Sequence, residues 1–110
     1  MATVYKVLGQ SALAATTATA VYTVPASTEA IISTITICNR DSESHTFRLA
    51  IAANEASLDN KEYIAYDVVL AANDAICLTL GFTLPAAKKV VAYADAAQIT
   101  VNVFGAEITA

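Results

Sequence analysis

Apolar and polar residues alternate with a period of two along most of the chain, the pattern of strands that bury one face. Turn-forming residues, mainly Pro, Gly, Asn and Asp, separate these segments. The pattern predicts about eight short strands and little room for a helix, with residues 10–18 as an extended connection. The expected strands cover residues 3–8, 19–24, 31–39, 45–52, 61–70, 75–82, 89–95 and 98–105.

The apolar side chains on one phase of these strands form the predicted core. In the third segment, Ile31, Ile35 and Ile37 are expected on one face, with Ser33 as its polar exception. In the fifth segment, the expected shared face contains Ile64, Tyr66, Val68 and Leu70. The residues expected to pack in one core are Ile35, Ile37, Phe47, Leu49, Ile51, Leu78, Leu80, Val101 and Val103.

These elements predict an all-β fold: a single antiparallel β-sandwich or jelly-roll-like domain spanning residues 1–110. A chain of 110 residues has the usual size of one domain. The two ends, residues 1–18 and 107–110, are expected to be extended segments. Such segments can reach a neighbouring subunit and add strands across the boundary.

The composition is unusual for a small soluble domain. Hydrophobic residues make up 56% of the chain and charged residues 15%, against about 45–50% and about 25% in ordinary soluble domains. A small domain has a large surface for its volume, so we expect part of this surface to be covered by other protein.

The sequence argues against nucleic-acid and membrane partners. The net charge is −4 and the six Lys and Arg residues are dispersed, which argues against nucleic-acid binding. No apolar run approaches the roughly 20 residues that span a bilayer. The first residues lack the pattern of a secretory signal, so we expect a protein made in the cytoplasm.

Chemistry-bearing residues are few. His45 is the single histidine, and we interpret it as an exposed polar residue that opens a strand. A dyad of Cys38 with His45 would lack a third group to orient the imidazole. Asp41, Glu43 and His45 are spaced by two, without the Gly and bidentate Glu of a calcium loop. We therefore expect no enzymatic activity, no catalytic residue, no cofactor and no metal.

The cysteines and aromatic residues fit structural roles. Cys38 and Cys77 have no CxxC spacing, and we expect them to be reduced and buried. The five Tyr and three Phe residues are scattered over separate segments, and no Trp is present. This scatter favours core filling and a few amphipathic rims over a sugar-binding platform. A small glycan-binding module remains the alternative from another functional class.

The chain resembles small structural proteins of tailed-phage virions. The resemblance begins with residues 22–40, where Tyr-Thr-Val-Pro-Ala is followed by Ser-Thr-Ile-Thr-Ile-Cys-Asn-Arg. It continues through Phe-Arg-Leu-Ala-Ile at 47–51, Tyr-Ile-Ala-Tyr-Asp-Val at 63–68, Ala-Asn-Asp at 72–74 and Phe-Gly-Ala-Glu-Ile at 104–108. It covers nearly the whole chain and brings no catalytic residues with it.

The resemblance implies a non-enzymatic bacteriophage structural protein located in the virion. A capsid decoration (cement) protein is expected first, because the sequence contains no helical or collagen-like shaft segment. Its partners would be itself, as a homotrimer, and the major capsid protein. The alternative is a viral tail part, in a tail fibre or baseplate.

Overall fold

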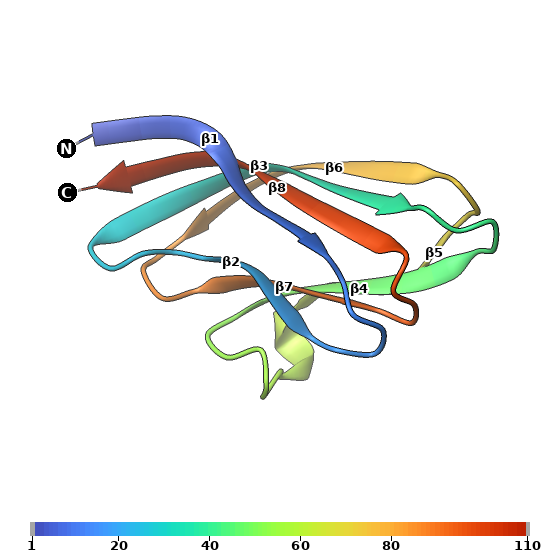
Figure 1. The fold of residues 1–110 in the computed structure, drawn as a ribbon. Helices are drawn as coiled ribbons and strands as arrows, with labels where there is room; N and C mark the ends of the chain where they lie inside the picture. Colours follow the sequence, from blue (N-terminus) through green and yellow to red (C-terminus); the bar gives the residue numbers. More distant parts are fainter. Residues whose placement is uncertain (1, 110) are drawn as a thin grey trace.

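The computed structural model describes residues 2–109, all with side chains except Leu80, and they form an antiparallel β-sandwich (Figure 1). One short 3₁₀ turn, η1 (Asn60–Glu62), precedes the fifth strand. Within residues 2–109, no helix is long and apolar enough to cross a membrane. The strands are β1 (Ala2–Ala12), β2 (Thr19–Thr23), β3 (Thr28–Asn39), β4 (His45–Ala52), β5 (Tyr63–Leu70), β6 (Ala75–Leu84), β7 (Lys89–Ala94) and β8 (Ile99–Thr109).

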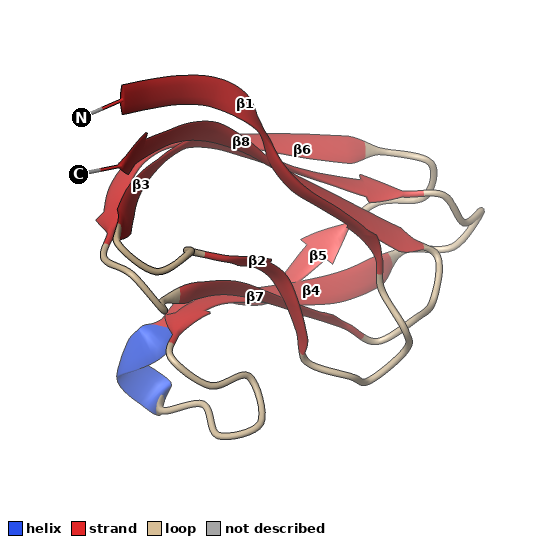
Figure 2. Cartoon of the chain, turned by 60° about the vertical axis from the view of Figure 1, so that its left-hand side comes forward, coloured by secondary structure: helices blue, strands red, loops and turns tan. Residues whose placement is uncertain are grey.

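The strands form two four-stranded sheets. Sheet A has the order β1-β8-β3-β6 and sheet B has the order β2-β7-β4-β5. Figure 2 shows the sheets as two layers, with η1 on the side of sheet B that faces away from sheet A. The predicted all-β sandwich is therefore confirmed.

The core lies between the two sheets. Of the nine residues predicted for it, Ile35, Ile37, Phe47, Leu49, Val101 and Val103 are buried. Ile51 and Leu78 are partly buried and pack against the same cluster, and the side chain of Leu80 lies outside the description. A second, smaller cluster forms where Leu58 and Tyr63 cover Ala50, Ala52 and Val91 of sheet B.

A bulge in β3 changes which residues face the core. Between Ile32 and Thr34, β3 carries one more residue than β8, where Gly105 and Phe104 are the partners. A bulge of this kind shifts the inside–outside alternation by one position. Ile32 is therefore buried and Ile31 is exposed. The prediction that Ile31 shares a face with Ile35 is wrong, and Ser33 marks the position of the bulge.

Two register shifts in β5 overturn a second facing prediction. β5 carries one extra residue between Val68 and Ala65, the partners of Phe47 and Leu49. It carries another between Ala65 and Tyr63, the partners of Leu49 and Ala50. Asp67 within the first shift has a φ of 50°, a left-handed conformation that Asp tolerates better than most residues. Of the predicted inner face, only Val68 and Leu70 point inward, whereas Ile64 and Tyr66 are exposed.

The chain ends belong to the molecule's own sheet. β1 pairs along β8 from Ala2 opposite Thr109 to Ala12 opposite Thr100, and β8 pairs on its other side with β3. Within residues 2–109, the expectation of arms that add strands to a neighbour is therefore wrong. Residues 1 and 110 of the two expected arms lie outside the described residues. Both ends of the chain meet at one end of the sandwich (Figure 1).

Candidate functional site

The outer face of sheet A carries a shallow apolar hollow. In the register, Tyr5 lies opposite Ala106, and Ala106 lies opposite Ile31. Side chains at paired positions share a face, so the small Ala106 forms a floor between two large neighbours. The hollow has a volume of about 290 Å³ and is lined by Tyr5, Lys6, Ile31, Ser33, Phe104, Gly105 and Ala106.

The residues around this hollow are unusually exposed for their type. Tyr5 is 83% exposed, Val7 48% and Ile31 38%. The four strands of sheet A carry only three charged residues in the part of the chain that the structure describes: Lys6, Glu29 and Glu107. Lys6 and Glu107 form an ion pair with 2.8 Å between Nζ and Oε1. Both side chains point to the inner side of the sheet, where Glu107 also meets Tyr22 of β2. The outer face around the hollow is thus apolar, and Glu29 is the charge that the described strands carry on it.

Glu107 also links the two sheets. The Tyr22 hydroxyl of β2 donates a hydrogen bond to Glu107 Oε2 at 2.6 Å. The bonds donated by Lys6 and Tyr22 hold the pKa of the Glu107 carboxyl below its usual value. Burial, together with the bond to Glu107, raises the pKa of Tyr22. The carboxylate stays ionised and the phenol stays protonated, which suits a structural tie between the sheets.

Sheet B gathers three tyrosines around Arg48 on its outer side. The Arg48 Cζ lies 4.2 Å from the centroid of the Tyr66 ring and 4.7 Å from that of Tyr93. Tyr63 contacts Tyr66 edge-on, with 4.9 Å between ring centroids. Arg48 also donates to Asp67, with Nε 2.6 Å from Oδ1. This cluster therefore departs from the expected scatter and core filling, and it fits the amphipathic rims expected for a few of these rings.

An open polar hollow adjoins the tyrosine cluster. It has a volume of about 530 Å³ and lies between the 13–18 connection and the loop after β4. Glu55, one of its lining residues, forms an ion pair with Lys89, with 2.7 Å between Oε2 and Nζ. Hydroxyl, carboxylate and guanidinium groups line it beside Tyr63 and Tyr93, a mixture that suits a hydroxyl-rich ligand.

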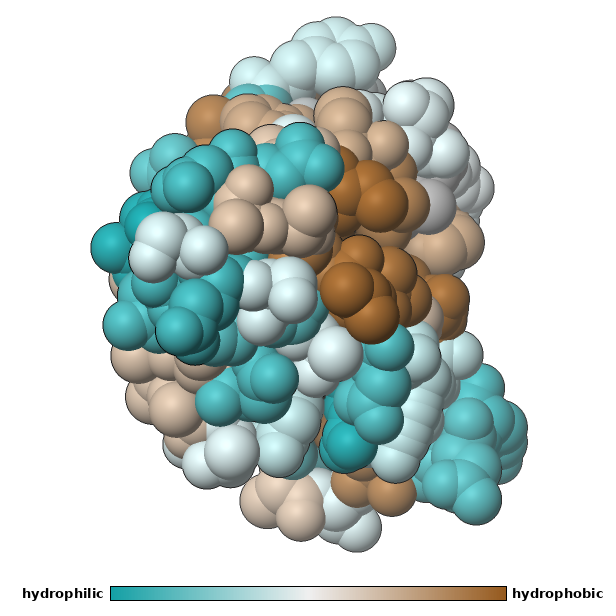
Figure 3. Space-filling model, turned by 90° about the vertical axis from the view of Figure 1, so that its right-hand side faces the viewer, coloured by the Kyte–Doolittle hydropathy of each residue, from teal (hydrophilic) through white to brown (hydrophobic). Residues whose placement is uncertain are grey.

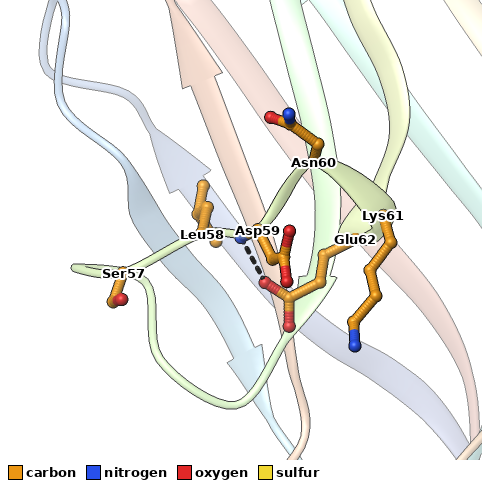
Figure 4. A pocket seen from close by; sticks show the side chains of 6 residues that line it. All are labelled: Ser57, Leu58, Asp59, Asn60, Lys61 and Glu62. Carbon is orange, nitrogen blue, oxygen red and sulfur yellow. Dashed lines mark hydrogen bonds between the residues drawn. The ribbon is translucent and has the colours of Figure 1, made fainter.

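A third hollow, of about 510 Å³, lies within a single loop, residues 57–62 (Figure 4). Figure 4 shows the Glu62 side chain turned back toward Asp59, whose backbone N–H donates to Glu62 Oε1 at 2.7 Å. This bond closes the η1 turn. Because all the lining residues are consecutive and serve the turn, we assign this hollow no ligand.

His45 lies between two carboxylates at the end of the sandwich away from the chain termini. Its Nε2 is 2.7 Å from Asp41 Oδ2 and its Nδ1 is 3.2 Å from Asp95 Oδ1. The bond to Asp41 raises the pKa of His45 and lowers that of Asp41. The interpretation of His45 as a simple exposed residue is wrong, because its side chain is only 14% exposed.

A buried asparagine sets the position of Asp41. Asn39 Nδ2 lies 2.8 Å from the Glu43 carbonyl oxygen, and its Oδ1 accepts from the Asp41 N–H at 3.0 Å. Asn39 is 1% exposed, and its amide also donates to the carbonyls of Leu70 and Ala71. The group formed by Asn39, Asp41, His45 and Asp95 therefore connects the turns that follow β3, β5 and β7. Within residues 2–109, no group of three or more His, Cys, Asp or Glu side chains could hold a metal ion.

The two cysteines lie on adjacent strands of sheet A. Cys38 pairs with Ala75 and Thr36 with Cys77, so the cysteines are diagonal neighbours. Diagonal Cα atoms are about 7–8 Å apart, beyond the usual span of a disulfide, and both thiols are free. Cys38 is half-buried and Cys77 is exposed. The prediction that both are buried is therefore wrong for Cys77, and Cys38 is only half-buried.

Apolar side chains also reach the surface at the end opposite the termini. Figure 3 shows that end, where an apolar area lies beside a hydrophilic one. Exposed apolar residues of β5 include Ile64 and Val69. β5 and β6 are the edge strands on this side of their sheets, so neither sheet edge is capped there by a further strand of the described chain.

No protein-family model matches the chain, and no curated protein matches its sequence. A functional assignment therefore depends on the surfaces described above. Sequence patterns did not reveal the hollow of sheet A, because Tyr5 and Ile31 are 26 positions apart and meet only through β8. A usable signal was Ser33, the polar break in the strand's apolar alternation.

Proposed function

We propose that this protein is a non-enzymatic structural subunit of a phage virion, and specifically a capsid decoration protein that stabilises the shell. The observation that carries the proposal is the outer face of sheet A, with Tyr5 83% exposed and Val7 48% exposed on strands that carry almost no charge. Contiguous exposed apolar surface of this kind marks protein–protein contact sites.

The proposed partners are further copies of the chain, as a homotrimer, and the major capsid protein. Closed symmetric assembly is the common way to cover an apolar face. The low share of charged residues, 15% of the chain, supports a subunit that works with part of its surface covered. The number three comes from the resemblance to small virion proteins.

Copy number on purified particles tests the location. Quantitative gel densitometry should find this protein at a level comparable with the major shell protein, because a decoration protein occupies many equivalent shell positions. A band far fainter than the shell protein's, lost together with detached tails, would instead assign the protein to a tail fibre or baseplate. Absence from purified particles would overturn a virion role altogether.

A glycan-binding module is the second candidate, and one observation favours it. Tyr63, Tyr66 and Tyr93 gather around Arg48 beside the open hollow of about 530 Å³. Aromatic rings with nearby hydrogen-bonding groups are suited to sugar faces and hydroxyls. A glycan array separates the two functions: specific binding that Tyr93→Ala abolishes would favour the module, and an empty array would exclude the glycans tested.

A further inference from the structure

Both ring nitrogens of His45 face a carboxylate. Nε2 lies 2.7 Å from Asp41 Oδ2, and Nδ1 lies 3.2 Å from Asp95 Oδ1. An ionised carboxylate only accepts hydrogen bonds, and an imidazole has an N–H on both nitrogens only when it is protonated. Both contacts of His45 are therefore hydrogen bonds only in the charged form of the ring.

Loss of one proton leaves a lone pair facing one of the two carboxylates. The contact to Asp41 is the shorter one, and the Asp41 side chain is 27% exposed, against 46% for Asp95. A hydrogen bond shielded from water is the stronger one, so the neutral ring keeps its hydrogen on Nε2. The Nδ1 lone pair then faces Asp95 Oδ1, and these two acceptors repel each other.

The turn between β7 and β8 is held less tightly at Asp95 than at its far end. Asp95 Oδ1 accepts from the Thr46 N–H at 3.3 Å, and the Asp95 N–H donates to the Thr46 carbonyl oxygen at 3.3 Å. Both distances are long for hydrogen bonds. At the far end, Arg40 donates to the carbonyl oxygens of Ala97 at 3.0 Å and Gln98 at 2.9 Å. Repulsion at Asp95 therefore moves the near end of the turn.

The turn between β3 and β4 is anchored independently of His45. The Asp41 N–H donates to the buried Asn39 side chain, and the Asp41 carbonyl oxygen accepts from the Asn73 N–H at 2.9 Å. Asp41 Oδ1 also accepts from the Ser42 N–H at 2.7 Å. Asp41 therefore keeps its position in both protonation states of the ring.

The charges around His45 favour its protonated form. The hydrogen bond to Asp41 raises the pKa of His45 most, and the charges of Asp95, Asp41 and Glu43 add to this effect against the lowering by burial. Asp74, on the turn between β5 and β6, instead directs its carboxylate to the next backbone N–H at 2.8 Å. The turns that meet at His45 thus contribute two carboxylates in contact with the ring and one acting at a distance.

We propose that His45 is a pH-dependent switch for the turn between β7 and β8: the doubly protonated ring holds Asp95 against β4, and loss of the Nδ1 proton to solvent releases it. Protonation of histidine is an established way to bias two arrangements of a protein near neutral pH. The switch lies within one chain and goes beyond the proposed function, because it needs no partner.

NMR titration of the full chain from pH 5.5 to 8.5 tests the switch. The ring ¹⁵N shifts of His45 give its protonation state and the nitrogen that keeps the hydrogen. The Thr46 amide proton, which bonds Asp95 Oδ1, should shift with the same midpoint as the ring. Protection of the Asp95 N–H against hydrogen exchange should fall at least tenfold over this interval, because the near end of the turn opens.

Two substitutions test the geometry from opposite sides of the ring. Asp95→Asn supplies an amide N–H for the Nδ1 lone pair, so the turn should stay closed over the whole interval. Asp41→Asn should move the hydrogen of the neutral ring to Nδ1, facing the remaining carboxylate, and should also keep the turn closed. Asp74→Asn is the matched control and should switch like the wild type.

Circular dichroism checks that each variant is folded, and the wild-type titration stands without them. A Thr46 amide that does not shift with the ring would overturn the inference. So would Asp95→Asn or Asp41→Asn chains that open like the wild type, or an Asp74→Asn chain that no longer switches. An equal loss of protection in every strand would also overturn it, since His45 would then act on global unfolding and not on this turn.

Discussion

The Tyr22 hydroxyl donates to the Glu107 carboxylate across 2.6 Å and joins an edge strand of sheet B to the central strand β8 of sheet A. Tyr22 is 7% exposed, and the carboxylate it serves is 13% exposed. A hydrogen bond to a charged group in such a place contributes more than one between neutral groups.

Removing this hydroxyl should destabilise the fold. We expect Tyr22→Phe to lower the free energy of unfolding by about 1.5–3 kcal/mol, because Glu107 loses a donor while its other partner, Lys6, is half-exposed. Urea denaturation measures the change. Tyr5→Phe is the control, since its ring is exposed and the loss of its hydroxyl should have little effect. Equal stability of Tyr22→Phe and wild type would contradict the role of the bond.

His45 should make stability depend on pH in the neutral range. Asp41 raises the pKa of His45 above its usual value of 6.5, so the folded state binds the proton more tightly than the unfolded state. The stabilisation is fully present below about pH 6.5 and is lost as the pH rises through the folded-state pKa. His45 is the only histidine in the sequence, which makes the assignment direct.

Melting temperatures measured from pH 5.5 to 8.5 check this. The wild type should lose stability over that interval, and His45→Gln should flatten the curve. Asp41→Asn should also flatten it, since it removes the carboxylate that accepts from the imidazole. A variant curve parallel to the wild-type curve would show that another group causes the dependence.

Two glycines of sheet A should respond differently to alanine. A Cβ at Gly105 would collide with the backbone carbonyl of Ile31, whereas a Cβ at Gly81 would meet open space. Neither glycine has a positive φ, so steric contact alone separates them. We expect Gly105→Ala to cost about 1–3 kcal/mol and Gly81→Ala to be neutral or slightly stabilising. Thermal melting compares them, and similar midpoints would count against the close approach.

The two thiols should react at different rates in the native protein. Cys77 is exposed and Cys38 is half-buried, and access controls thiol reactivity. Titration with an aromatic disulfide should show one fast and one slow equivalent. Cys77→Ser should remove the fast phase and Cys38→Ser should retain it. Two slow thiols would contradict the exposure of Cys77.

Strand periodicity predicted much of the fold because burial of one face imposes it directly. The strand His45–Ala52 was placed with its observed ends, and Phe47 and Leu49 are buried as expected. The facing predictions were wrong for Ile31, Ile64 and Tyr66, and all three residues lie next to register shifts. A bulge is defined by the partner strand, so one strand's sequence carries only a faint trace of it.

The surfaces were harder to predict than the core. Arg48 meets Asp67 and Tyr93 only because β4 lies between β5 and β7, and strand order is not encoded in local alternation. His45 likewise contacts both Asp41 and Asp95 only because two separate turns meet beside it in the folded chain. Sequence spacing pointed to Asp41 and gave no sign of Asp95.

The bulges also determine where the chain can change length. At Ser33, two consecutive residues, Ser33 and Thr34, separate the buried Ile32 and Ile35. Deleting Ser33 would leave every flanking side chain on its present face, and deleting Asp67 would do the same between Ala65 and Val68. Deleting a residue away from a bulge, for example Thr36, would move all side chains on one side of the deletion to the opposite face of the sheet. Natural relatives with one residue fewer in β3 or β5 are therefore expected to lose it at a bulge, such as Ser33 or Asp67.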